Sequence, residues 1–452
     1  MAAWTGPVSL ADVDVPPFET AVTFDADDPQ KEYPGYPLGI AAGDYDGDQD
    51  IDLVVVNTTY YASSCPSGGA IGGSVTVFTN TGDWSPIADG LDPTYITVCS
   101  DCAPQEVAFA YIDEDAELDI VVSAGDYDIG DEDDDWGIYI SLQSNGQFGS
   151  FTKVIDAVGD FTTPPRGLVI ANFDGEDGDD IAVAGDTCHE DSGSTANDKV
   201  YVFLNDGEGN FTLLDDYDLG LNNVNQAAAF EITVADFHRG AGYLNKPDLA
   251  TSNLFDDNKT SILVNNGSSF SVNSYSDPCS SSWDFADITS GQFNGNSDPD
   301  AAVIDRPGTE IRVLYGNGAG SFSHDCDDHD EGGDRYALSF DCSSQQAPNY
   351  WPGGIASGNL NCDTKADLAA VWYCSDVIIL LAGWGPMSLT KFQYDGSDGD
   401  YHISPDPSGG SVSGLVKVLI ANLDDDAFGD LVTTNQDTQN ISVMINATTS
   451  CP

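Results

Sequence analysis

The sequence predicts an all-β fold: a seven-bladed β-propeller made of four-stranded antiparallel blades. Three observations support this prediction. An acidic loop motif recurs seven times along the 452 residues, each copy is followed by the same succession of short apolar runs and turns, and no stretch has the 3.6-residue period of an amphipathic helix. Short strands in units of about 63 residues are typical of propellers. Such a repeat fold can use nearly the whole chain as one domain.

The repeat is clearest in the segment Gly43-Asp44-Tyr-Asp46-Gly-Asp48-Gln-Asp50-Ile-Asp52. In register with it, the seven loops start at Asp44, Tyr111, Asn172, Asp236, Gln292, Asn359 and Asn422. Loop two is degenerate because a tyrosine holds its first position, and loop four because it is stretched to Asp248. One such loop can arise by chance, but seven at spacings of 56 to 67 residues indicate a true repeat.

Each unit continues in the same way after its loop. An apolar run such as 53–56 is followed by an alternating run such as 75–78, and then by a Gly/Asn turn before phenylalanine, as in Asn145-Gly-Gln-Phe148. Runs of period two bounded by Gly/Asn turns are typical of strands joined by hairpins. The unit is therefore predicted to be one four-stranded blade.

Closure of the ring is predicted from the two ends of the chain. The last unit stops soon after its third strand at 441–444, and an orphan strand lies at 18–24. Pairing of 18–24 with 441–445 would complete the last blade and cover an exposed edge. Residues 18–452 would then form a single propeller, preceded by an N-terminal arm, 1–17, that we expect to dock on the propeller or on a neighbouring molecule.

The loop, the apolar strand after it and the later Asn-Gly turn resemble FG-GAP (VCBS) repeats, as found in the propeller of integrin α-subunits. The resemblance covers roughly residues 18–446. It implies structural Ca²⁺ in the loops, held by side chains at positions 1, 3, 5 and 9 and by the main-chain carbonyl at position 7. The chain departs from the family at position six, where the common glycine is replaced by Gln49, Asp177, Ser297, Thr364 and Ala427.

Calcium takes six to eight oxygen ligands from carboxylates and carbonyls, which these loops can supply. Loop one offers Asp44, Asp46, Asp48 and Asp52, with Asp50 at position 7. Loop three offers Asn172, Asp174, Glu176 and Asp180; loop six Asn359, Asn361, Asp363 and Asp367; loop seven Asn422, Asp424, Asp426 and Asp430. Loop five offers Gln292, Asn294, Asn296 and Asp300, whose single carboxylate should make it the weakest. The alternative is that all of them are solvated Asx-rich turns without metal.

The charge balance restricts the partners. The chain has 76 acidic and 13 basic residues, a formal net charge of -63. This charge repels nucleic acid and anionic membranes and attracts divalent cations. A halophilic origin is an alternative explanation of the acidity, whereas 40% apolar and 10% aromatic residues argue against disorder. We expect no membrane insertion, since no apolar stretch is long enough.

Ten cysteines without zinc-like spacing favour disulfides, and hence an extracellular location. The pair Cys99 and Cys102 forms a lone CxxC, and Cys326–Cys342 and Cys362–Cys374 are plausible bridges among several connectivities. Six N-x-S/T sequons, weak support for secretion and glycosylation, start at Asn57, Asn210, Asn258, Asn266, Asn440 and Asn446.

Other candidate sites are weaker. The acidic run 131–135 and the cluster from His324 to His329 match no standard metal spacing, and the isolated histidines 189, 238 and 402 lack a nucleophile motif beside them. Tryptophans such as Trp84 and Trp372 are expected in the core, although some could stack on sugars. We therefore predict no enzymatic activity.

The predicted function is that of an extracellular calcium-binding propeller that acts as an adhesion or interaction scaffold, including the version in which it assembles into a fibre or surface layer. Its partner would be a protein or a glycan. The alternative is a carbohydrate-binding lectin or a polysaccharide lyase. A lyase acting on acidic sugars is disfavoured because the chain has few cations to offset the substrate charge.

Overall fold

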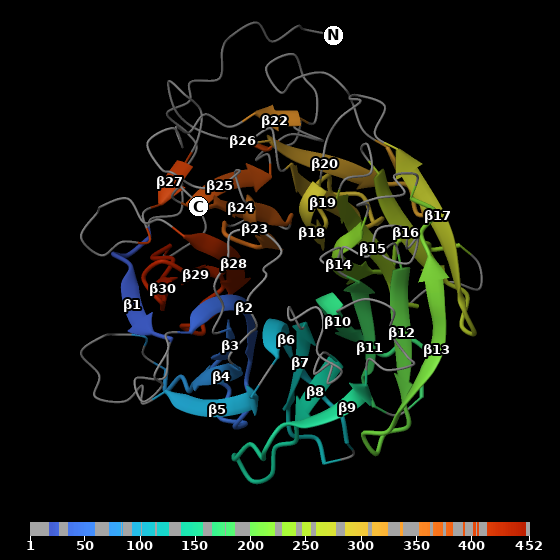
Figure 1. Cartoon of the computed structure of the whole chain (residues 1–452). Helices are drawn as coiled ribbons and strands as arrows, with labels where there is room; N and C mark the ends of the chain where they lie inside the picture. Colours follow the sequence, from blue (N-terminus) through green and yellow to red (C-terminus); the bar gives the residue numbers. More distant parts are fainter. Residues whose placement is uncertain are drawn as a thin grey trace, which may run out of the picture.

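The computed structural model is a seven-bladed β-propeller, in which seven antiparallel sheets are arranged in a ring around a central axis (Figure 1). It describes residues 18–26, 35–58, 72–82, 84, 93–100, 102–113, 115–125, 137–156, 165–176, 178–185, 199–221, 228–240, 246–254, 259–276, 285–305, 310–323, 335–337, 352–361, 365–373, 377–382, 392–393, 401–403, 405 and 414–448. None of these residues lies in a helix, so the described part of the chain has no helix that could span a membrane. The predicted fold class is confirmed.

The first four blades each contain four consecutive strands, ordered from the channel outward. Blade one is β2 (Tyr36–Gly43), β3 (Asp52–Thr58), β4 (Gly73–Phe78) and β5 (Thr94–Cys99). Blade two is β6 (Ala103–Ala110), β7 (Asp119–Gly125), β8 (Gly137–Ser141) and β9 (Thr152–Asp156). Blade three is β10 (Pro165–Ala171), β11 (Asp180–Gly185), β12 (Lys199–Asn205) and β13 (Phe211–Asp218). Blade four is β14 (Ala228–Ala235), β15 (Asp248–Leu254), β16 (Lys259–Asn265) and β17 (Phe270–Ser276).

In blades five and six the outermost strand is in two short pieces that both pair with the third strand. Blade five is β18 (Phe285–Gly291), β19 (Asp300–Asp305), β20 (Glu310–Gly316), β21 (Phe322–Ser323) and β22 (Arg335–Ala337). Blade six is β23 (Pro352–Gly358), β24 (Asp367–Trp372), β25 (Val377–Ala382), β26 (Phe392–Gln393) and β27 (Tyr401–Ile403). Blade seven is β28 (Leu415–Ala421), β29 (Asp430–Asn435), β30 (Asn440–Met444) and the N-terminal strand β1 (Val22–Asp25).

The core lies between the blades. Strand β3 is buried along its whole length, as is β4 beside it, because both faces of a blade pack against neighbours. Val54 and Val77 of blade one, for example, belong to one buried cluster with Ile120 of blade two. This double-sided burial explains why the sequence shows continuous Val/Ile/Leu runs in the second strands and not a simple alternation.

Strand β1 closes the ring as predicted. It pairs antiparallel with β30, with Val22 opposite Val443 and Asp25 opposite Asn440, so that strands from the two halves of the chain lie side by side in blade seven (Figure 1). Phe24 packs edge-on against Trp84, with ring centroids 5.6 Å apart, and so joins the closing strand to blade one. The predicted arm, residues 1–17, lies outside the described residues.

Candidate metal sites in the loops between first and second strands

The seven acidic loops each connect the innermost strand of a blade to its second strand. Because the innermost strands run in the same direction in every blade, the loops gather on one face of the ring. The hairpins between third and fourth strands open on this face as well. Loops and hairpins of adjacent blades can therefore contact one another around the whole ring.

A buried aspartate ends every loop. These position-9 residues are all fully buried: Asp52, Asp119, Asp180, Asp248, Asp300, Asp367 and Asp430. In loop one, the carboxylate of Asp52 accepts hydrogen bonds from the main-chain N–H groups of Tyr45, at 3.0 Å, and Asn80, at 2.7 Å. Burial raises the pKa of Asp52 to about 7, although these two hydrogen bonds oppose the shift. The position-9 aspartates thus anchor each loop inside its blade.

An Asn or Gln at or just beyond the end of the third strand joins neighbouring blades. The Asn80 side-chain amide donates to the main-chain oxygens of Ile51 in its own loop and Leu423 in loop seven. The same contact to the preceding blade is made by Gln143, Asn205, Asn265 and Asn446. Sequence reasoning missed this contact, although the recurrence of Asn or Gln at the end of the third strand is a signal that could have predicted it.

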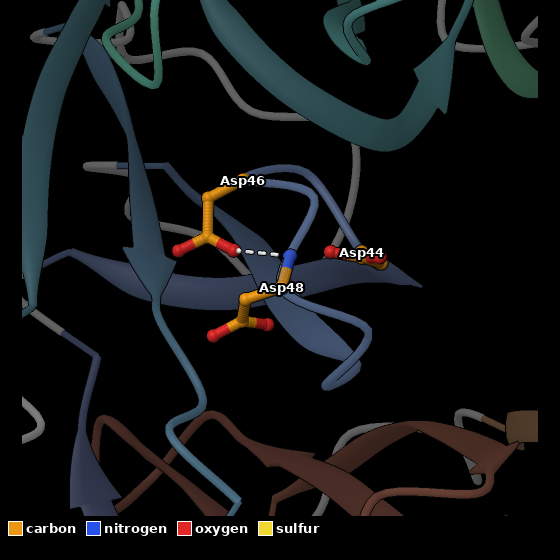
Figure 2. A group of neighbouring side chains, drawn as sticks. All are labelled: Asp44, Asp46 and Asp48. Atoms are coloured by element: carbon orange, nitrogen blue, oxygen red, sulfur yellow. Dashed lines mark hydrogen bonds between the residues drawn. The ribbon is translucent and has the colours of Figure 1, made fainter.

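Loop one brings three carboxylates together. Oxygens of Asp44, Asp46 and Asp48 all lie within 4.8 Å of one another (Figure 2), and no other such group of acidic, cysteine or histidine ligands occurs among the described residues. Burial, followed by repulsion from Asp48, raises the pKa of Asp46. Asp52 lies apart from this group, in the interior. Three of the predicted ligands therefore lie close enough together to hold one metal ion.

Turn hydrogen bonds occur in loop one and in degenerate loop two alike. In loop one the N–H of Asp48 donates to Asp46, at 3.3 Å; in loop two the N–H of Asp115 donates to Asp113, at 3.1 Å. These bonds are those of Asx turns, as the metal-free alternative requires. They do not distinguish the two interpretations. Loop one differs from loop two in the convergence of its three carboxylates.

Loops three and seven begin with an asparagine that closes its own loop. Asn172 donates from its amide nitrogen to the main-chain oxygen of Glu176, and Asn422 does the same to Asp426. The amide oxygen of Asn422 is then buried and accepts no hydrogen bond. A buried oxygen without a donor is costly, and a bound Ca²⁺ would satisfy it. The residues of loop seven therefore fit the ion.

Loops five and six present fewer charges. The side-chain oxygen of Gln292 is buried without a hydrogen-bond donor, as in loop seven. Asn294 and Asn361, at position 3, donate from their amides to Asp300 and Asp367. The remaining predicted ligand of loop six, Asp363, lies outside the described residues.

Loops two and four attach to the next blade through the main chain. Asp113 forms a β-bridge with Glu208, and His238 forms one with Ala319. In loop four the Nε of Arg239 lies 3.3 Å from the carboxylate of Asp236. The two degenerate loops thus use main-chain pairing, and loop four adds a cation that belongs to the protein itself.

Several other sequence candidates can be placed. Cys99 and Cys102 form a disulfide, so this CxxC binds no zinc. Trp84 and Trp372 are buried in the core, as expected. The sequon residues Asn57 and Asn446 are each 1% exposed and hydrogen-bonded inside the ring. The bridges Cys326–Cys342 and Cys362–Cys374, the run 131–135 and the cluster 324–329 lie outside the described residues.

Comparison with known proteins supports the fold alone. No protein-family model and no curated protein sequence matches the chain. Among solved structures, the β-propeller domain of Cps50 (Swd1) from Myceliophteria thermophila is 10% identical, with a TM-score of 0.51, covering 96% of this chain and 100% of that one. An exotype rhamnogalacturonan lyase, YesX, is 12% identical (TM-score 0.48; 94% and 76% covered), and an N-acetylglucosamine-specific Agrocybe aegerita lectin is 16% identical (TM-score 0.42; 82% and 80% covered).

Proposed function

We propose that this chain is an extracellular propeller that binds Ca²⁺ in its FG-GAP-like loops and acts as an interaction scaffold for a protein or glycan partner. The observation that carries the proposal is the convergence of Asp44, Asp46 and Asp48 in loop one. These carboxylates would hold the ion, with the main-chain carbonyl of Asp50 as a further oxygen ligand. The ion would offset their mutual repulsion and fix the loop against its blade.

The scaffold part of the proposal is supported by how the loops are held. Amides such as Asn80 and Asn205 join each loop to the loop of the adjacent blade, at 2.8 Å in both cases. A continuous, rigid face of acidic loops offers a surface whose net charge depends on bound Ca²⁺. Contact with a partner would then become calcium-dependent, since an uncompensated acidic face repels most acidic proteins and acidic glycans.

Calorimetric titration with CaCl₂ tests the metal part. We expect Asp48→Ala to remove the tightest binding event, because it deletes one of three converging carboxylates. Asp115→Ala is the matched control, since Asp115 stands at the same position of loop two and accepts the same turn hydrogen bond. Identical titrations for the wild type and Asp48→Ala would contradict calcium binding in loop one.

Light scattering and glycan-array binding, each with CaCl₂ and with EDTA, test the scaffold part. Calcium-dependent assembly supports the fibre or surface-layer version, and calcium-dependent binding to a neutral glycan supports the lectin alternative. Cleavage of an acidic polysaccharide would contradict both. A chain that binds Ca²⁺ but neither assembles nor binds a protein or glycan would contradict the scaffold while leaving the metal part intact.

A further inference from the structure

The innermost strands share a feature that faces the channel. Each of the seven has a β-bulge near the same place, seen as a shift in its pairing with the second strand. After each bulge comes an aliphatic residue, such as Ile40 in blade one, and the residue immediately before it occupies the same position in every blade. In blade order these residues are Gly39, Glu106, Gly167, Glu231, Asp287, Gly354 and Lys417. A bulge re-aims a side chain, so four charged groups at one level are directed toward the axis.

These four charges meet across the channel. The Lys417 ammonium lies 2.8 Å from a carboxylate oxygen of Glu106, 3.2 Å from one of Glu231 and 3.6 Å from one of Asp287. The ammonium belongs to blade seven and the carboxylates to blades two, four and five. Their side chains are only 8% to 19% exposed, beside a cavity of about 250 Å³. One ammonium thus lies within ion-pair distance of three acidic groups.

The glycines at the same level leave space for these side chains. A Cβ at Gly39 would lie 2.7 Å from a carboxylate oxygen of Glu106, and one at Gly354 would lie 3.1 Å from Cδ of Lys417. A Cβ at Gly167 would lie 3.2 Å from a carboxylate oxygen of Glu231. Each glycine belongs to the blade that precedes a charged one. At these three positions the close approach of the next innermost strand and its charged side chain therefore favours glycine.

The other groups at the axis keep the cluster close to neutral. Arg166 of blade three lies 4.0 Å from Glu231 and stacks on the Phe230 ring, 3.7 Å from its centroid. Burial raises the pKa of Glu231 to about 8, and although burial alone would lower the pKa of Lys417, the three carboxylates together raise it well above its usual value. Blades one and six contribute only uncharged groups to the cavity lining. Two basic groups, Lys417 and Arg166, thus face the three acidic groups of the cluster.

We infer that Lys417 is an axial latch that couples closure of the ring to neutralisation of charge in the channel. Blade seven combines the first strand of the chain, β1, with the last three, β28 to β30, so it exists only when the ring is closed. Until it takes its place, Glu106, Glu231 and Asp287 lack the ammonium that holds them together. Removing one member of a buried ionic network leaves the others uncompensated, which is strongly unfavourable. Lys417 therefore selects the closed ring with its strands in this register.

Amide hydrogen exchange measured on the full chain tests the latch. We expect Lys417→Met to reduce protection of β1, β28 and β30 by about 100-fold or more, as loss of one partner of a buried ion pair implies. The control is Lys199→Met, which removes a lysine whose ion pair with Asp216 is partly exposed. In Lys199→Met, the protection of β1, β28 and β30 should stay within about twofold of that in the wild type.

A second variant separates the latch from simple loss of packing. In Lys417→Met combined with Glu106→Gln and Asp287→Asn, the remaining acidic group, Glu231, still faces Arg166, so no charge is left uncompensated, and we expect most of the protection to return. This arm applies even if Lys417→Met alone fails to fold. The inference is overturned if Lys417→Met keeps wild-type protection, or if the combined variant is as weakened as the single one.

Discussion

Removal of the Asn205 side chain tests whether the contacts between blades stabilise the ring. This side chain is 4% exposed. Its amide donates to the main-chain oxygens of Ile112, in blade two, and Asp179, at 2.8 and 3.2 Å. Its oxygen accepts from the N–H groups of Gly207 and Gly209, at 3.1 and 3.2 Å. Asn205→Ala deletes all four of these hydrogen bonds. It leaves intact the hydrogen bond that the main-chain N–H of residue 205 donates to Asp180.

The expected cost follows from these contacts. A net contribution of about 1 kcal/mol per hydrogen bond gives a loss of about 4 kcal/mol in the free energy of unfolding. The value rises if main-chain groups stay buried without partners, and falls if water enters the space. Urea unfolding followed by circular dichroism measures it. Asn210→Ala is the control, because Asn210 is exposed and its amide bonds only Asp206; we expect a change within about 0.5 kcal/mol. Equal costs for the two variants would refute the reasoning.

Three further predictions concern charge and strain. The pKa of Glu231 is about 8 in the folded chain and 4.5 in the unfolded chain, so the free energy of unfolding falls as pH rises between these values. The free energy of unfolding of Glu231→Gln, measured with urea, should therefore rise relative to that of the wild type by a few kcal/mol between pH 5 and 8. A difference that stays constant with pH would contradict this. Gln49 has φ +81°, which favours glycine, so Gln49→Gly should raise the free energy of unfolding by about 1 kcal/mol in calorimetry; a decrease would argue against strain there. Arg239→Ala should lower the melting temperature equally in Ca²⁺ and in EDTA, whereas an effect seen only in EDTA would mean that loop four also binds the ion.

The sequence predicts the blades and the closure of the ring because the evidence for both is local. Strand periods, Gly/Asn turns and the spacing of the loops can all be read within one unit, and the orphan strand 18–24 has only one incomplete blade to join. The carboxylates of loop one are also close in sequence, so their convergence could be foreseen. At position six of loop one the glycine rule fails in sequence but holds in geometry, since Gln49 adopts the conformation that glycine favours, whereas Ser297 and Ala427 do not.

Contacts between blades could not be predicted in the same way. The partner of the Asn80 amide is the carbonyl of Leu423, 343 residues away, and only the closed ring brings the two together. The resemblance to FG-GAP repeats predicts the position-9 aspartates of loops one, three, five, six and seven as ligands. Their hydrogen bonds to the end of the third strand depend on a blade that the spacing does not describe, and these bonds place Asp52 in the interior, apart from Asp44, Asp46 and Asp48.

The axial cluster could not be predicted because a single charged residue in an apolar strand does not indicate which residues it will contact. Glu106 and Lys417 are recognisable as members of a cluster only when the innermost strands are aligned, so that the glycines and charged residues fall at one level. The same alignment shows where a chain of net charge -63 places two of its 13 basic residues. Exposed loop carboxylates can be neutralised from solution, by Ca²⁺ or by salt. Carboxylates in the channel are largely removed from solvent, so the chain must supply their cations itself, and it does so with Lys417 and Arg166. Repulsion between acidic groups can thus be reduced by cations from solution on the loop face, whereas at the axis it is reduced by basic side chains of the chain itself.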